Sequence, residues 1–207
     1  MNDDLKRYIE REILPRYDGY DKAHQLDHIN KVINQSLEIA SHFDVDTDMV
    51  YAIAAYHDLG IVKGREFHHI ESAKMLLADD VLKQYFTQGQ LVTMAEAIED
   101  HRASAKNEPR GIYGRIVAEA DRQIDPHTII LRTIQYGLNY YPELEKEEQY
   151  DRMLKHLKEK YGYGGYRKLH FEFSENHRKL EQLREMMNDE KSIRAIFDQI
   201  WESNRNN

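Results

Sequence analysis

Four side chains suited to binding a metal stand in otherwise apolar stretches of this 207-residue chain. The doublet His57-Asp58 closes a long apolar run and is followed closely by Gly60. His28 lies upstream and Asp121 downstream, each among apolar neighbours. Burying such polar groups is costly unless something compensates them. A shared metal ion would compensate all four.

Two further histidines, His69 and His101, extend this set to six. Imidazole and carboxylate groups together suit a divalent metal ion (Mn, Fe, Co, Ni, Zn or Mg). Because the chain has no cysteine, we expect an open site that keeps a water rather than a closed thiolate site. Adjacent helical residues point about 100° apart, so one ion can bind both His57 and Asp58 only where a helix ends. Gly60 predicts such an end.

Several of these residues also allow a purely structural interpretation. His69 could be an exposed residue at the start of a helix, and His101 could simply complement the dipole at a helix C-terminus. Lys63 and Arg65 follow the doublet directly. They could bind a phosphate group held at the metal, or they could be a solvated pair in a loop. The sequence leaves these choices open.

Apolar residues recur at helical spacing almost throughout the chain, which predicts an all-α fold without strands. The expected helices cover residues 5–13, 22–43, 47–60, a segment from 68, 91–101, 111–124, a segment from 126, a segment from 174, and 189–202. Residues 143–160 are strongly charged. The following Gly/Tyr segment, 161–166, lacks the ending of a phosphate-binding loop, so we expect it to connect helices.

The motifs around the metal-competent residues resemble those of the HD-domain superfamily of metal-dependent phosphohydrolases. The pattern H…HD…D is carried by Asp27-His28-Ile29-Asn30-Lys31-Val32, Ala54-Ala55-Tyr56-His57-Asp58-Leu59-Gly60 and Glu119-Ala120-Asp121-Arg122. These segments are similar to the family's DHxxxV, AALLHDIG and DADR elements, and the resemblance spans about residues 20–140. It implies an all-helical bundle, with an HD domain over residues 1–142 and a C-terminal helical extension, 143–207, packed on it.

The resemblance also implies roles for individual residues. The positions that hold one metal in HD proteins match His28, His57, Asp58 and Asp121. The positions that hold a second metal in some members match His69, in an HxxxA element, and His101. If both of these bind, Asp58 would bridge two ions. The family aspartate is also a proton acceptor, which makes Asp58 the candidate general base, with Lys63 and Arg65 as candidate phosphate ligands.

The activity that the resemblance implies is hydrolysis of a phosphate ester or anhydride by a metal-activated water. The substrate would be a nucleotide or another small phosphorylated metabolite. The same ligand set also resembles that of HD-type mixed-valent di-iron oxygenases. A third alternative is a non-catalytic, metal-containing sensor or interaction module, because the charged tail from Glu143 would suit protein contacts or a homodimer.

The composition of the chain excludes several classes of partner. A net charge of -8 argues against broad nucleic-acid binding, which relies on cationic side chains. Lys and Arg are nevertheless concentrated in residues 151–184, either as a solvated helical face or as a basic rim that attracts a phosphorylated substrate. We expect no membrane span, no signal peptide and no disulfides. A cytoplasmic location fits best.

Overall fold

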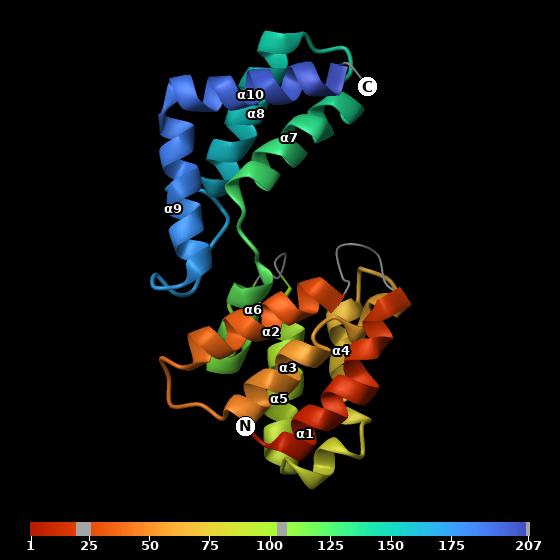
Figure 1. Ribbon diagram of the computed structural model, residues 1–207. Coiled ribbons are helices and arrows are strands. Elements are labelled where there is room, and N and C mark those ends of the chain that lie inside the picture. The colour runs from red at the N-terminus through yellow and green to blue at the C-terminus, as the bar shows by residue number, and fades with distance from the viewer. Residues whose placement is uncertain (20–25, 103–106, 206–207) are drawn as a thin grey trace. The chain divides into compact units, whose positions relative to one another are not determined.

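The computed structural model describes residues 1–19, 26–102 and 107–205. These residues form α-helices joined by turns and short 3-10 segments, with no strand among them. The all-α prediction is therefore confirmed. Within the same ranges, no helix combines the length and the apolar character that crossing a membrane requires. The chain divides into two compact units, Met1–Arg122 and Gln123–Asn207, which we describe separately (Figure 1).

The first unit is built around one buried helix. Its helices are α1 (Asp3–Tyr8), α2 (Leu26–Ala40), α3 (Thr47–Tyr56), α4 (His68–Leu77), α5 (Gln88–Asp100) and α6 (Ile112–Asp121). Helix α3 packs against α2, α4, α5 and α6 (Figure 1). Every residue of α3 from Met49 to Tyr56 is buried, because a helix that is apolar on all sides must be covered on all sides.

Both ends of α3 are set by local interactions. The side chain of Asp46 accepts hydrogen bonds from the backbone N–H groups of Asp48 and Met49 and so caps the N-terminus of the helix. The helix ends at Tyr56, with His57 as its C-cap, and not at Gly60 as the sequence indicated.

Gly60 is needed for a different reason, which is close packing. A Cβ atom at this position would lie 2.2 Å from the carbonyl oxygen of His68 and 2.6 Å from the backbone nitrogen of Ser72. The Gly60 N–H donates to Ser72 Oγ at 2.8 Å. The glycine therefore lets the first turn of α4 lie directly on the chain that follows the doublet.

Helix α2 and the N-terminal segment also contribute buried residues to the core of the first unit. The sequence predicts a helix over residues 22–43. Its predicted start lies outside the described residues, which leave out 20–25. The observed helix ends at Ala40. Its buried residues are Ile29, Val32, Ile33, Ser36, Ile39 and Ala40. Before it, α1 continues as a π-helical turn, Ile9–Ile13, and a 3-10 helix, Leu14–Gly19.

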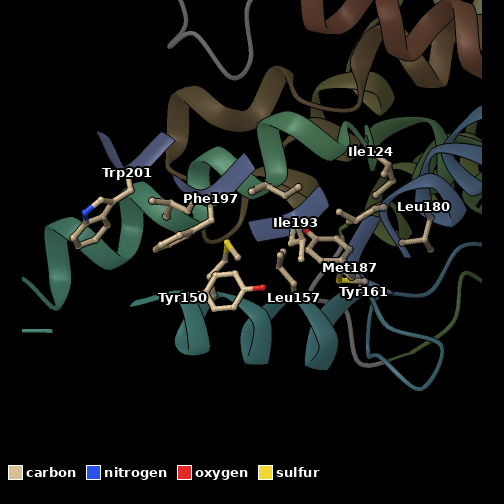
Figure 2. Packing of buried hydrophobic residues seen from close by; sticks show 13 residues of the cluster. Ile124, Tyr150, Leu157, Tyr161, Leu180, Met187, Ile193, Phe197 and Trp201 are labelled. Atoms are coloured by element: carbon tan, nitrogen blue, oxygen red, sulfur yellow. The ribbon is translucent and has the colours of Figure 1, made fainter. Parts of the chain in front are cut away.

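The second unit has its own hydrophobic core. Its helices are α7 (Pro126–Tyr140), α8 (Lys146–Tyr161), α9 (Glu175–Asn188) and α10 (Glu190–Arg205). Ile130 and Ile134 of α7 are buried together with Leu157 and Phe197. Figure 2 shows Leu157 and Phe197 among the side chains of this cluster. The sequence placed a domain boundary after Pro142, whereas this shared core groups α7 with the helices that follow it. The segment 161–166 covers the last residue of α8 and the first part of the connection, residues 162–174, that leads to α9.

Candidate metal centre

The His57-Asp58 doublet lies where α3 ends. His57 is the C-cap of α3, and Asp58 has φ -112° and ψ 6°, in the sparsely populated bridge region of backbone conformation. A 3-10 helix, Leu59–Lys63, follows. This change of backbone direction lets two adjacent side chains reach one place, and His57 Nε2 lies 3.4 Å from Asp58 Oδ2.

A first group of ligand atoms forms around Asp58 Oδ2. His28, in the first turn of α2, and Asp121, the last residue of α6, join the doublet there. His28 Nε2 lies 3.7 Å from Asp58 Oδ2 and 3.2 Å from Asp121 Oδ1. His57 Nε2 lies 3.7 Å from Asp121 Oδ1. The structure thus brings together the four residues of the predicted first metal site, with their ligand atoms within 4.8 Å of one another.

A second group forms around the other carboxylate oxygen of Asp58. Asp58 Oδ1 lies 3.3 Å from His68 Nε2 and 3.5 Å from His101 Nε2. These two imidazole nitrogens are 3.2 Å apart. Asp58 therefore presents one oxygen to each group, which is the arrangement of a bridging ligand.

The sequence assigned the second group to His69, whereas the structure places His68 there. Consecutive side chains on a helix diverge by about 100°, so only one of the two histidines at the start of α4 can face Asp58. His69 was the expected residue because it stands four residues before Ala73 in an HxxxA element. Its ring packs against that of His68 with centroids 5.5 Å apart.

Backbone carbonyl groups orient three of the imidazoles. Each Nδ1 lies at hydrogen-bond distance from the carbonyl oxygen three residues earlier: 2.7 Å for His57 to Ala54, 2.7 Å for His68 to Arg65, and 2.6 Å for His101 to Ile98. A carbonyl oxygen can only accept, so each Nδ1 carries a proton, and Nε2 is the nitrogen that offers a lone pair to a metal when the ring is neutral. The dipole interpretation of His101 is thus compatible with ligation, because one ring nitrogen contacts the helix end and the other faces Asp58.

The two groups are closed on one side and accessible on another. The side chains of His57 and His101 are 0% and 2% exposed. Those of His28, His68 and Asp121 are 14%, 13% and 22% exposed. Solvent or a ligand can therefore reach the site on the side of the latter three residues.

The charges of the site shift the pKa values of its members in opposite directions. Burial disfavours a charged His57, but Asp58 and Asp121 overcome it and raise the pKa of this imidazole well above its usual value. The pKa of His28 is raised in the same way. Burial likewise opposes ionisation of the two carboxyls, yet the imidazoles lower the pKa of Asp58 and of Asp121. For His68, burial prevails and lowers the pKa.

The arrangement fits a bound metal. Bonds of about 2.0–2.2 Å from an ion to its ligands place neighbouring ligand atoms about 3–4 Å apart, and the nitrogen–oxygen distances here are 3.2–3.7 Å. The buried Nε2 of His57 has no hydrogen-bond partner among the described residues. Such an atom is costly to bury, and a metal ion would satisfy it.

Lys63 and Arg65 are exposed in the segment between the doublet and α4. The structure gives Arg65 a clear backbone role, since its carbonyl orients His68. Phosphate binding by the two side chains remains a prediction.

Comparison with known proteins identifies the part of the chain that carries this site. Residues 26–123 match the family model of the HD domain. This part of the chain is similar to HD domains. It contains every residue of both ligand groups, and it leaves the N-terminal segment and nearly all of the second unit outside.

Among solved structures, the chain is similar to a predicted HD superfamily hydrolase from an uncultured Thermotogales bacterium. The two share 24% sequence identity and a TM-score of 0.49, over 76% of this chain and 94% of that one. Comparison with curated proteins gives no match.

The positions of His68 and His69 can be tested by exchanging each for alanine. We expect His68→Ala to abolish binding of the second metal ion and His69→Ala to retain it, because only His68 faces Asp58. Isothermal titration calorimetry with Mn²⁺ or Co²⁺ measures how many ions each variant binds. Loss of an ion in His69→Ala, with His68→Ala unchanged, would restore the sequence-based assignment.

The pKa shifts predict how the stability of the metal-free domain depends on pH. A pKa raised by folding, as for His57, contributes stability that is complete below the unfolded value of 6.5 and is lost as the pH rises through the folded pKa. The lowered pKa of Asp58 contributes stability above its unfolded value of 3.8, which is lost at lower pH. We therefore expect the free energy of unfolding to fall above about pH 6.5, by about 1.4 kcal/mol for each unit of histidine shift.

Urea unfolding of the chelator-treated protein, followed by circular dichroism across this range, provides the measurement. Added Mn²⁺ will reverse the loss at high pH, since metal binding requires deprotonated imidazoles. His42→Asn, a change of an exposed histidine, is the control and will keep the wild-type dependence. A stability that is independent of pH without metal would contradict the expectation.

Proposed function

We propose that this HD domain is a metal-dependent hydrolase of phosphate esters or anhydrides, with a nucleotide or another small phosphorylated metabolite as its substrate. One observation carries the proposal: Asp58 turns one oxygen toward each of two ligand groups. Pairs of metal ions that share ligands in this way act on phosphoryl groups in many enzymes. A bound ion would lower the pKa of a coordinated water and polarise a phosphoryl oxygen.

The protein's own residues would hold the metal, admit the substrate and shield the inner side of the site. His28, His68 and Asp121 form its accessible side, so the phosphorylated end of a substrate would approach past them. His57 and His101 close the opposite side with the buried face of α3 behind them. This geometry would exclude bulk water except where the substrate enters.

Asp58 would serve the reaction first as a ligand. Its carboxylate is 4% exposed and is surrounded by imidazoles, which hold its pKa below the usual range. A carboxylate of lowered pKa is a weak proton acceptor, so positioning the ions is the larger part of its proposed role. Its action as general base stays a prediction.

The central experiment joins metal analysis with a screen of substrates. The protein is purified without added metal, its metal content is measured, and hydrolysis is assayed across nucleotides and phosphate esters with Mn²⁺ or Co²⁺. Phosphate release would support the proposal. Oxygen uptake by an iron-loaded protein would favour the di-iron oxygenase instead. Tightly bound metal with no turnover of any substrate would favour a sensor or interaction module.

Replacement of Asp58 tests the shared carboxylate. We expect Asp58→Ala to lose both metal binding and turnover, with the rate falling by at least about 10²–10⁴-fold. The matched control is Asp80→Ala, which removes an exposed carboxylate of the same unit and will keep both. A metal-free Asp58→Ala protein with full activity would exclude the mechanism.

Replacement of Lys63 and Arg65 tests the proposed phosphate contacts. A charge-assisted hydrogen bond contributes about 1.5–3 kcal/mol, so we expect Lys63→Ala or Arg65→Ala to raise KM by about 10–100-fold. Metal affinity will stay unchanged, since neither side chain belongs to a ligand group. Steady-state kinetics with the best substrate of the screen measures the effect, and unchanged KM values in both variants would show that they are a solvated pair.

A further inference from the structure

The last turn of α3, which presents the doublet, is held by residues from outside the HD domain match. The final carbonyl groups of a helix have no partners within it. Here the Ala54 carbonyl lies at hydrogen-bond distance from His57 Nδ1, and the Ala55 carbonyl accepts from the hydroxyl of Tyr17 at 2.9 Å. Tyr17 belongs to the N-terminal segment and is completely buried. The carbonyl two residues before His57 is therefore fixed by a distant part of the chain.

A second contact ties the same turn to the N-terminal segment and to the end of α4. The hydroxyl groups of Tyr8 and Tyr56 both donate to Asp79 Oδ2, each at 2.6 Å. The other oxygen of Asp79 accepts from the backbone N–H of Val81 at 3.0 Å, which holds the carboxylate in the turn after α4. Tyr56 directly precedes His57 and is 1% exposed. Its ring cannot shift without breaking this shared contact.

The hydrogen bonds that Tyr8 and Tyr56 donate to the Asp79 carboxylate are the shorter ones, at 2.6 Å. Burial, followed by the nearby Asp79 carboxylate, raises the pKa of Tyr8 to about 12. The phenol therefore stays protonated at neutral pH and remains a donor to Asp79, as the geometry requires. Hydrogen bonds to a charged acceptor are stronger than those between neutral groups.

We infer that Tyr17 and Tyr8 are positioning residues of the metal centre, and that the N-terminal segment, residues 1–19, holds the end of α3 so that His57 and Asp58 point to the ligand groups. This inference rests on the metal site of the proposed function and not on its substrate. The HD domain match begins at residue 26, so the segment lies outside the matched residues. Groups that orient metal ligands typically change metal affinity by 10–100-fold when they are removed.

The test uses Tyr17→Phe and Tyr8→Phe in the full chain, because phenylalanine keeps the ring and removes only the hydroxyl donor. Titration with Co²⁺, followed by its visible absorption spectrum, reports both affinity and ligand geometry without any assay of activity. We expect each variant to bind Co²⁺ about 10–100-fold more weakly and to show an altered spectrum when saturated. Circular dichroism will confirm that the variants are folded at the temperature of the titration.

Two controls separate positioning from general stability. Tyr51→Phe removes the hydroxyl of a buried tyrosine in the first half of α3 and will leave affinity and spectrum unchanged. Leu5→Ala weakens the apolar packing of the same N-terminal segment, where Leu5 is 0% exposed. It will lower the melting temperature while the Co²⁺ spectrum remains that of the wild type.

The inference is overturned if Tyr17→Phe and Tyr8→Phe bind Co²⁺ as the wild type does, or if Leu5→Ala changes affinity and spectrum as much as they do. A wild-type chain that binds no Co²⁺ would overturn it as well. A wild-type chain that binds Co²⁺ normally and hydrolyses no phosphate ester contradicts only the proposed function.

Discussion

The enclosure of one carboxylate by four imidazoles is the constraint on which the first unit depends. Asp58 is 4% exposed, and both of its oxygens lie within 3.3–3.7 Å of histidine nitrogens. A buried charge of this kind is tolerated only when opposite charges or a metal compensate it. Protonated imidazoles can do so in the metal-free domain, and metal ions can replace the protons. The fold must therefore keep ligands from five helices or helix ends at fixed distances.

These ligands come from the ends of helices, and this explains how they can converge. His28 lies in the first turn of α2 and His68 begins α4, whereas His57 and His101 are the C-caps of α3 and α5 and Asp121 ends α6. At these C-caps the Nδ1 of each imidazole lies next to a carbonyl oxygen of the last helical turn. These carbonyls thus set the ring orientation that metal binding needs.

The second unit serves a different structural purpose. It buries its own aromatic and aliphatic residues among α7, α8, α9 and α10, which is what a separately packed unit requires. Several basic side chains of residues 151–184 form ion pairs within one helix, such as Lys179 and Arg178 with Glu175, and Arg184 with Glu181. These pairs favour a solvated face for that segment, and attraction of a phosphorylated substrate by it stays a prediction.

The sequence by itself determined the helical class, and its resemblance to HD proteins indicated the four residues that the structure gathers in the first ligand group. It could do so because helical periodicity is a local property of the chain and because each element of the H…HD…D motif is a short segment that can be recognised without the fold. The choice of His68 over His69, the packing that requires Gly60, and the grouping of α7 with the second unit were decided only by the tertiary structure. Each depends on which surfaces meet in space, and two adjacent histidines or a charged helix look alike in sequence until a neighbouring element covers one side of them.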